Sequence, residues 1–266
     1  LASWSANSAL GFQVSGASSG DELGSSVSSA GDVNNDGYAD ILIGAPYADP
    51  VSRDGAGIAY LLFGKLGGVA DINTTNATFG GVDGIRIYGT EASALGYSVS
   101  GVGDVNGDGI DDFMVGARWH SVVSPKRDRA GLAVIIFGKL SGWGDIDMSN
   151  FVTANDLGFR VIGKSENDYF GQSVSSAGDM NADGFADIII GALSADPLGR
   201  INAGTAYVLF GHSNASSFTD IDLALFPSGF QIQGAAAEDN YGYAVTGGFD
   251  LNDDGFSDVA LSSATT

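Results

Sequence analysis

Four loops rich in aspartate and asparagine carry the residues of this chain that could do chemistry. They share the pattern D-x-N-x-D-G-x-x-D and span residues 32–40, 104–112, 179–187 and 250–258. Their first residues are 72, 75 and 71 positions apart, so one unit is repeated along the chain. Each copy gathers carboxylate and amide oxygens, the ligands that calcium prefers. The sequence therefore predicts one Ca²⁺ site in each loop, about four in all.

The predicted ligands follow from the position of each residue in the loop. Side chains at positions 1, 3, 5 and 9 offer oxygens in every copy, and position 7 offers its main-chain carbonyl. Glycine at position 6 tolerates a positive φ, which lets the chain wrap around an ion. Without a cation, carboxylates held in one tight turn would repel one another. The predicted ligands are Asp32, Asn34, Asp36, Tyr38, Asp40, Asp104, Asn106, Asp108, Ile110, Asp112, Asp179, Asn181, Asp183, Phe185, Asp187, Asp250, Asn252, Asp254, Phe256 and Asp258.

The loops differ from the other common aspartate-rich calcium loops. An EF-hand needs a bidentate glutamate at position 12 and a helix on each side. Position 12 is aliphatic here, and it lies in apolar runs such as 41–43 and 188–190 that predict strands. An EF-hand or a dockerin-like helical loop is therefore excluded. The remaining alternative is a set of ordinary Asp-Gly and Asn-Asp hairpin turns, although four in-register copies favour calcium.

Composition indicates a folded, strongly acidic domain. The 266 residues are 44% hydrophobic, which is enough for a substantial core. The 41 glycines suit short strands and tight turns. A formal charge of −21 disfavours nucleic acid and anionic membrane surfaces as partners. No transmembrane run or signal peptide is visible, and the start at Leu1 is interpreted as a processed form or a segment.

Each repeat predicts four short strands in the same order. A strand such as 11–14 precedes an acidic turn, and a small-residue strand such as 23–27 leads into the loop. The loop runs into 41–43, and a last strand such as 58–64 follows. The last two strand types are apolar at nearly every residue, so both of their faces should be covered. With no helical pattern between the strands, the sequence predicts an all-β fold of β-propeller blades.

The order of these elements resembles a known family. A Phe-Gly element, the aspartate loop and the Gly44-Ala45-Pro46 that follows it are similar to FG-GAP repeats of the integrin α-subunit propeller and of bacterial surface proteins. Gly-Ala-Pro is intact only in this copy, because Arg118 and Leu193 replace the proline and the fourth copy reads Ser262-Ser263-Ala264. The resemblance implies calcium loops in hairpins on one face of a propeller. It also implies partners on the opposite face or rim.

The chain is predicted to be a single β-propeller region over residues 1–266. Its repeats span approximately 11–83, 84–157, 158–228 and 229–266, the last one incomplete. The resemblance implies seven blades, so we expect this region to be part of a larger, seven-bladed propeller or to pair with another chain. Alternatively, the N-terminal strand completes the last blade and closes a small ring.

Other chemistry has little support in the sequence. His120 and His212 lie at non-equivalent places, and the G-x-S-x-G match at 16–20 precedes a strand where a nucleophile elbow needs a helix. We therefore expect no enzymatic activity. The acidic turns at Glu22, Glu91, Glu166 and Glu238 are interpreted as solvated hairpin ends rather than a second cation site. Tyr47, Trp119 and Trp143 are expected to pack in loops rather than stack on sugars.

Together these features predict a calcium-binding extracellular adhesion or matrix module. Its partner would be a protein or glycan at the cell surface, without nucleic acid and without membrane insertion. Two alternatives remain: a structural subunit of a surface layer or filament, and a lectin-like or accessory propeller of a larger secreted enzyme. Asn73, Asn76 and Asn214 are candidate glycosylation sites in the linkers between repeats.

Overall fold

The computed structural model describes residues 11–75, 79, 81, 83–153, 157–213, 218–225 and 230–264. Regular structure in these residues is almost entirely β, with short 3₁₀ turns at η1 (Pro50–Ser52), η2 (Met148–Asn150) and η4 (Pro197–Gly199). The all-β prediction is confirmed. Within the described part of the chain, no helix has the length and apolar character that crossing a membrane requires.

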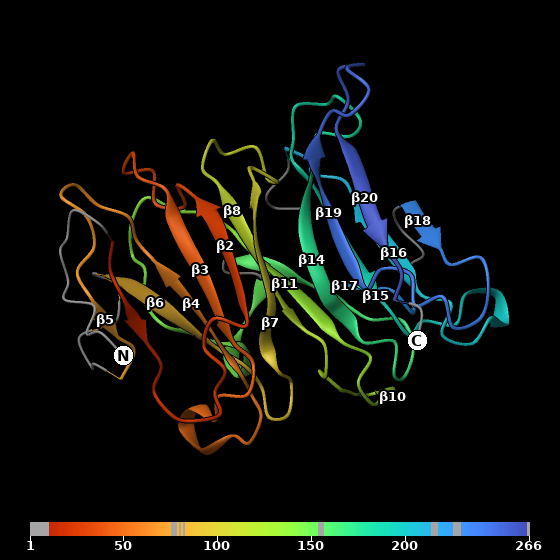
Figure 1. Cartoon of the computed structure of the whole chain (residues 1–266), viewed down its shortest axis with the longest axis horizontal. Coiled ribbons are helices and arrows are strands. Elements are labelled where there is room, and N and C mark those ends of the chain that lie inside the picture. Colours follow the sequence, from red (N-terminus) through yellow and green to blue (C-terminus); the bar gives the residue numbers. More distant parts are fainter. Residues whose placement is uncertain are drawn as a thin grey trace.

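Three larger sheets form a row (Figure 1). The first has the strands β2 (Ser26–Gly31), β3 (Asp40–Ala45), β4 (Ile58–Leu62), β6 (Gly84–Tyr88) and β12 (Ile146–Asp147). The second has β7 (Leu95–Gly103), β8 (Asp112–Ala117), β11 (Leu132–Ile136), β13 (Gly158–Ile162) and β17 (Ile221–Asp222). The third has β14 (Phe170–Gly178), β15 (Asp187–Ala192), β16 (Thr205–Leu209) and β18 (Phe230–Gln233).

Each sheet is an antiparallel four-stranded blade, and the first two blades gain a short parallel strand from the following repeat. β12 pairs in parallel with β6, and β17 pairs in parallel with β13. Smaller two-stranded sheets are β19 (Ala244–Phe249) with β20 (Asp258–Ser262), β1 (Val14–Ser15) with β5 (Ile72–Asn73), and β9 (Val122–Val123) with β10 (Lys126–Arg127).

The row of sheets is open within the described residues. β5 and the β19–β20 hairpin lie at opposite ends of it, and β1 pairs with β5 rather than with β20 (Figure 1). The first strands of successive sheets, β2, β7, β14 and β19, pack against one another. The arrangement is consistent with propeller blades, whereas ring closure and the number of blades stay predictions.

The sheets extend across the predicted repeat boundaries. The strand that opens the second predicted repeat, β6, is hydrogen-bonded to β4 of the first. In the same way β13 pairs with β11, and β18 with β16. The predicted boundaries are therefore one of several ways to divide a periodic sequence into repeats. With these boundaries, the fourth strand of each complete blade comes from the next repeat.

The core lies between the sheets. Leu42 and Phe63 of the first repeat pack with Phe113 and Ile136 of the second in one buried cluster. A second cluster joins the opposite face of the second sheet to the third. Every residue of β8 and β11 is buried, so both faces of the second sheet are covered. This covering explains why these strands are apolar at consecutive positions.

Close approach of neighbouring sheets depends on the first glycine of the Gly-Ala-Pro element. A β-carbon at Gly44, Gly116 or Gly191 would lie 1.9, 2.2 or 2.1 Å from the carbonyl oxygen of a glycine in the next repeat. Those partners are Gly96, Gly171 and Gly242. Glycine is therefore required here because a side chain would push two backbones apart.

Substituting this glycine should destabilise the protein. We expect Gly116→Ala to lower the free energy of unfolding by about 1–3 kcal/mol, because its methyl group would overlap the Gly171 carbonyl. The matched control is Gly144→Ala, where an added β-carbon meets no atom within 4 Å. Chemical denaturation of both variants checks the prediction, and an equal effect in the two would contradict it.

Candidate metal-binding loops

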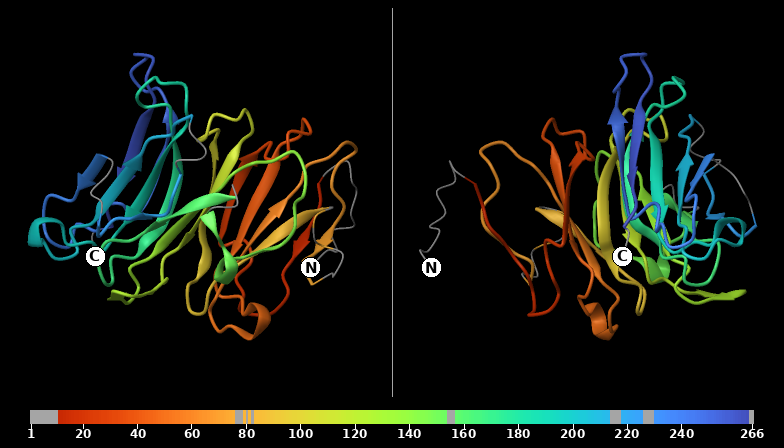
Figure 2. Two further views of the ribbon diagram at one scale, coloured as in Figure 1. Left: turned by 180° about the vertical axis from the view of Figure 1, so that it is seen from behind. Right: turned by 45° about the vertical axis from the view of Figure 1, so that its right-hand side comes forward.

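The four aspartate loops occupy equivalent places in the fold. Each joins the first two strands of a sheet: β2 to β3, β7 to β8, β14 to β15, and β19 to β20. All four project from the same edge of the row, the upper edge in Figures 1 and 2. The loops therefore lie in hairpins as expected, whereas their place on one face of a closed propeller stays a prediction.

Side chains at positions 1, 3 and 5 converge in each loop. In the first loop, Oδ1 of Asp32 and Oδ1 of Asn34 both accept the Asp36 N–H at 3.0 Å. The Asn34 amide donates to Oδ2 of Asp36, also at 3.0 Å. The same three bonds recur in the other loops at 2.8–3.2 Å. Three predicted ligands of every loop thus lie together, in one arrangement repeated four times.

Glycine at position 6 completes this arrangement. Gly37 has a φ of +90° and donates its N–H to Oδ2 of Asp32 at 2.8 Å. Gly109, Gly184 and Gly255 repeat the bond at 2.8–2.9 Å. The next residue, Tyr38, donates its N–H to Oδ1 of Asp36 at 3.0 Å. Position 7 therefore lies where the chain leaves the turn, as in the loops with Ile110, Phe185 and Phe256.

Position 9 lies inside the sheet rather than at the loop surface. Asp40 is fully buried, and its two carboxylate oxygens accept the N–H groups of Val33 at 3.0 Å and Gly64 at 2.8 Å. Asp112 and Asp187 make the same pair of bonds. This carboxylate therefore ties the loop to the end of the third strand.

The anchor explains the Phe-Gly element. Gly64 follows Phe63, and a β-carbon on Gly64 would lie 2.4 Å from the Ala39 carbonyl oxygen. Glycine lets its own N–H reach the buried carboxylate. The sequence predicted Asp40 only as a metal ligand and missed this second role. The recurring pair of a position-9 aspartate and a later Phe-Gly was the available signal.

The fourth loop has half of the anchor. Asp258 accepts the N–H of Leu251 at 2.7 Å, and among the described residues no Phe-Gly amide reaches its other oxygen. Asp258 is partly exposed, whereas Asp40, Asp112 and Asp187 are fully buried. The loop keeps its internal bonds nonetheless, so positions 1–6 are organised locally.

Burial makes the position-9 carboxylates of the first three loops costly to ionise. It raises the pKa of Asp40 to about 6 and that of Asp112 to about 8, and it also raises the pKa of Asp187. The two backbone N–H bonds oppose this shift, and the other aspartates of the loop add to it. A cation in the loop would favour the charged form.

The loop residues fit calcium by their chemistry. Their donors are all oxygens, and each Asp32 oxygen that accepts one N–H keeps a second lone pair. In the described residues, no three Asp, Glu, His or Cys side chains converge as a ready ligand set. The reason lies at position 9, where the carboxylate is directed to backbone amides. Positions 1, 3 and 5 would therefore make the first contacts with an ion.

A second recurring set of charged residues was missed in the sequence. Asp147 of β12 accepts two bonds from Arg53 at 2.6 and 2.8 Å, and Asp222 of β17 accepts the same pair from Arg127. Each pair fastens a strand of one repeat to the blade of the preceding repeat. The repeated Asp-Ile-Asp at 145–147 and 220–222, and Arg-x-x-Ala-Gly at 53–57 and 127–131, were the signal.

The remaining sequence candidates lie in structural settings. The 16–20 segment forms a bend and turn before β2. Trp143 packs against Phe63 and Phe113 with ring centroids 5.7 and 6.3 Å apart, and Tyr47 lies 5.6 Å from Trp119. Asn73 is exposed in β5, whereas Asn76 and Asn214 lie outside the described residues. The acidic turns with Glu22, Glu91, Glu166 and Glu238 are exposed.

The two histidines also differ in setting. His212 stacks on Phe218 with ring centroids 4.0 Å apart. Nδ1 of His120 lies 3.3 Å from the Thr90 hydroxyl. Burial, together with a smaller contribution from the positive charge of Arg160, lowers the pKa of His120 to about 4.

Removing a buried anchor should destabilise the fold without any metal. We expect Asp112→Ala, measured in excess chelator, to lower the free energy of unfolding by about 2 kcal/mol or more, because two buried N–H groups lose their acceptor. The matched control is Asp258→Ala, because the Asp258 carboxylate accepts the Leu251 N–H at a more exposed place. Equal losses in urea denaturation would contradict the anchor.

His120 should make the protein less stable in acid. Its pKa is about 4 in the folded state and about 6.5 when unfolded, so the unfolded chain takes up a proton first. Its contribution is complete above pH 6.5 and is lost as the pH falls to 4, by up to about 3 kcal/mol. Denaturation of wild type and His120→Gln in chelator at several pH values checks this. Parallel stability curves would argue against it.

Comparison with known proteins agrees with this geometry. Residues 23–62, 95–135 and 170–209 each match the FG-GAP repeat. Each match covers the first three strands of one complete sheet with its aspartate loop. The fourth predicted repeat lies outside the matched segments, although its loop makes the same internal hydrogen bonds.

Curated relatives are integrin α subunits. Integrin alpha-3 of Cricetulus griseus is 28% identical over 181 residues, 68% of this chain and 15% of the relative. Integrin alpha-6 of Gallus gallus is 31% identical over 61% of this chain, and integrin alpha-PS2 of Drosophila melanogaster is 26% identical over 90%. The alignments span only 13–16% of these relatives. This chain therefore carries three FG-GAP repeats, and over the aligned residues it is similar to integrin α subunits.

Proposed function

We propose that this chain is a non-enzymatic, calcium-stabilised adhesion module that acts outside the cell. The observation that carries the proposal is the identical arrangement of positions 1, 3 and 5 in four equivalent hairpins. Ordinary hairpin turns do not require the same acidic residues in every copy. Binding the same kind of ion in each loop does require these residues. Because all of the donor atoms are oxygens, the ion that they favour is calcium.

The loops are placed so that ion binding would stiffen more than one hairpin. The N–H of Lys139 in the second repeat donates to the Val33 carbonyl of the first loop at 2.9 Å. Ala186 donates to the Asp104 carbonyl at 3.0 Å, and Ser257 to the Asp179 carbonyl at 3.2 Å. Calcium would supply charge neutralisation and a cross-link within a loop. These inter-sheet bonds would carry the added rigidity along the row.

The adhesion role is supported by the similarity to integrin α subunits. Because the chain spans a small part of those relatives, the partner is a proposal as well. We infer a protein or glycan ligand at the cell surface or matrix. Calcium loops of this type are usually filled where the ion is abundant, which favours an extracellular location.

The strand ends opposite the loops offer a surface for such a partner. The Arg118 guanidinium lies 3.9 Å from the Tyr97 ring centroid and 5.0 Å from that of Trp119. It also donates to Gln172 at 2.7 Å, so it joins the second sheet to the third. Aromatic and arginine side chains are enriched at protein interfaces. This cluster is the part of the surface that we assign to partner contact.

Thermal unfolding with excess calcium and with chelator tests the calcium half of the proposal. One site at a hundred times its Kd adds about 2.7 kcal/mol, so filled loops should raise the Tm by several degrees. Asp36→Ala should lower the Tm much more in calcium than in chelator, because in chelator it removes only the exposed hydrogen bonds from Asn34 and Tyr38.

Asp54→Ala is the matched control, since it removes an exposed carboxylate outside the loops. Equal losses for Asp36→Ala with and without calcium, or no effect of calcium on the wild type, would leave the loops as metal-free turns.

A further inference from the structure

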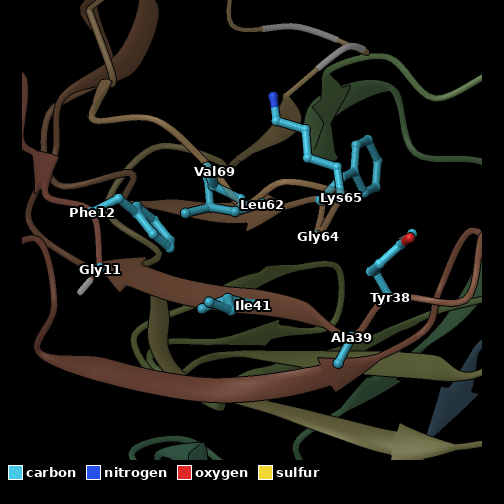
Figure 3. Close-up of a pocket in the computed structure, with 11 residues that line it drawn as sticks. Gly11, Phe12, Tyr38, Ala39, Ile41, Leu62, Gly64, Lys65 and Val69 are labelled. Carbon is cyan, nitrogen blue, oxygen red and sulfur yellow. The ribbon is translucent and has the colours of Figure 1, made fainter. Parts of the chain in front are cut away.

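Two cavities of this molecule differ in the residues around them. One, of about 340 Å³, has the apolar side chains of Ile41, Leu62 and Val69 around it (Figure 3). The corresponding surface of the second sheet is covered by Val33 and Phe63 of the first repeat, so a neighbouring repeat accounts for its apolar walls. The other cavity, of about 170 Å³, has polar walls and lies in the third blade.

Two buried hydroxyl groups line this third-blade cavity. Thr205 and Tyr207 of β16 are only 2% and 3% exposed, and neither hydroxyl makes a hydrogen bond with another described residue. Tyr207 belongs to the buried cluster that joins the second sheet to the third, so the second sheet already covers this face. Burial and the negative charge of Asp168 both raise the pKa of Tyr207, which places its hydroxyl on the Asp168 side of the cavity.

A buried carboxylate lines the same cavity. Asp168 is 4% exposed, and its Oδ2 accepts the Ser165 N–H at 2.9 Å. Its Oδ1 accepts no hydrogen bond from the described residues. Buried polar groups in proteins are normally hydrogen-bonded. The free oxygen of Asp168 and the two hydroxyls therefore indicate a polar ligand in the cavity.

The second blade shows what occupies the equivalent place there. His120 corresponds to Ala195, because each donates its N–H to the alanine three residues earlier, at 3.1 and 3.2 Å, and each accepts a glycine N–H at 2.9 Å. Nδ1 of His120 lies 3.3 Å from the hydroxyl of Thr90, whose counterpart Lys164 lines the third-blade cavity. The second blade includes its fifth strand, β17, and the place is nonetheless filled by an imidazole of the blade itself.

The third blade has aspartates where the second blade has serines. The carbonyls of Ser93 and Asp168 accept equivalent N–H groups at 3.2 and 3.4 Å. Oγ of Ser121 and Oδ1 of Asp196 likewise accept a loop N–H, at 2.9 and 2.7 Å. The serine oxygen is used by that bond, whereas Asp196 keeps a second oxygen, which accepts no bond from the described residues. The exchange thus removes an imidazole and adds two carboxylates.

The alanine and the two aspartates also occur together in the first blade. Asp21, Ala48 and Asp49 take the three positions there, beside a cavity of about 380 Å³. The blade with histidine is the one that has serines. Empty space and negative charge therefore appear together, which indicates that the occupant is a cation.

The negative charge of the third-blade cavity is not neutralised by an ion pair. No salt bridge of the described residues includes Asp168 or Asp196. Burial, with a smaller contribution from Asp196, raises the pKa of Asp168 to about 6, although the Ser165 N–H and the charge of Lys164 oppose the shift. Calcium prefers six to eight oxygen ligands. No three Asp, Glu, His or Cys side chains converge in the described residues, so the site does not favour a metal.

We propose that the third-blade cavity binds a small organic cation with N–H groups, of about the size of an imidazolium ring. Its N–H groups would donate to the free carboxylate oxygens of Asp168 and Asp196 and to the hydroxyls of Thr205 and Tyr207. The imidazole of His120 gives the size, because it occupies the equivalent place. Asp196 follows β15 at the end away from the aspartate loop, so this site is separate from the proposed calcium sites.

Titration of the full chain with methylguanidinium, followed by amide NMR, tests the proposal. This ion stays protonated and carries several N–H donors. In the wild type, the signals of Ala195, Asn202 and Thr205 should shift saturably, in calcium and in chelator alike. Methylurea has nearly the same shape without the charge, so it should leave these signals unchanged.

Two variants should remove the binding. Asp168→Asn should weaken it at least tenfold, because it removes the buried charge. Ala195→His should abolish it by filling the cavity as His120 does, and it decides the test if Asp168→Asn does not fold. The matched control is Asp239→Asn, because Asp239 accepts the Ala236 N–H at 2.7 Å in the equivalent turn of the fourth repeat.

Three results would overturn the proposal: no saturable shift in the wild type, equal binding of methylurea, or equal binding by the wild type and Ala195→His. Displacement of methylguanidinium by calcium at these signals would also overturn it, because the cavity would then be a metal site. None of these results depends on calcium binding in the aspartate loops.

Discussion

The rest of the structure depends on one buried interaction, the carboxylate at position 9 held by two backbone amides. In each complete sheet it joins the aspartate loop to the glycine that ends the third strand. The loop, which belongs to the first hairpin, is thereby fixed to the third strand of the blade. Because the loop also bonds to the next sheet, this single side chain sets the position of the inter-sheet contact as well.

The glycines of the FG-GAP pattern follow from the same geometry. Gly64 is needed so that an amide reaches Asp40, and Gly44 is needed so that the backbone of the first sheet can approach Gly96 of the second. One glycine thus serves the connection within a blade, and the other serves the connection between blades. The phenylalanine contributes apolar contacts between blades, since Phe63 and Phe137 each pack in a buried cluster with residues of the next sheet. The motif therefore describes the contacts within and between blades.

The sequence predicted the strands, the hairpin loops and their repetition, because buried β-branched runs and aspartate spacing are local signals. It could not assign the direction of a side chain. Asp40 has the spacing of a ligand, yet its oxygens point to Val33 and Gly64. The sequence analysis also placed a repeat boundary before β6, although β6 pairs with β4 of the preceding repeat. Periodicity alone does not show which strands pair. The clasp of Arg53 with Asp147 depends on residues 94 positions apart, a pairing that recurring motifs suggest but do not specify.

The choice of aspartate at position 9 reconciles the anchor with an ion site. An asparagine would direct its own NH₂ group at one of the two backbone donors, so only a carboxylate accepts from both. Ionising that carboxylate has an electrostatic cost, because burial and the neighbouring loop aspartates both disfavour its negative charge. A cation beside positions 1, 3 and 5 would offset the cost at its source. The fold and the proposed calcium site therefore use the same negative charge, which is why a structural anchor and a ligand set can share one nine-residue loop.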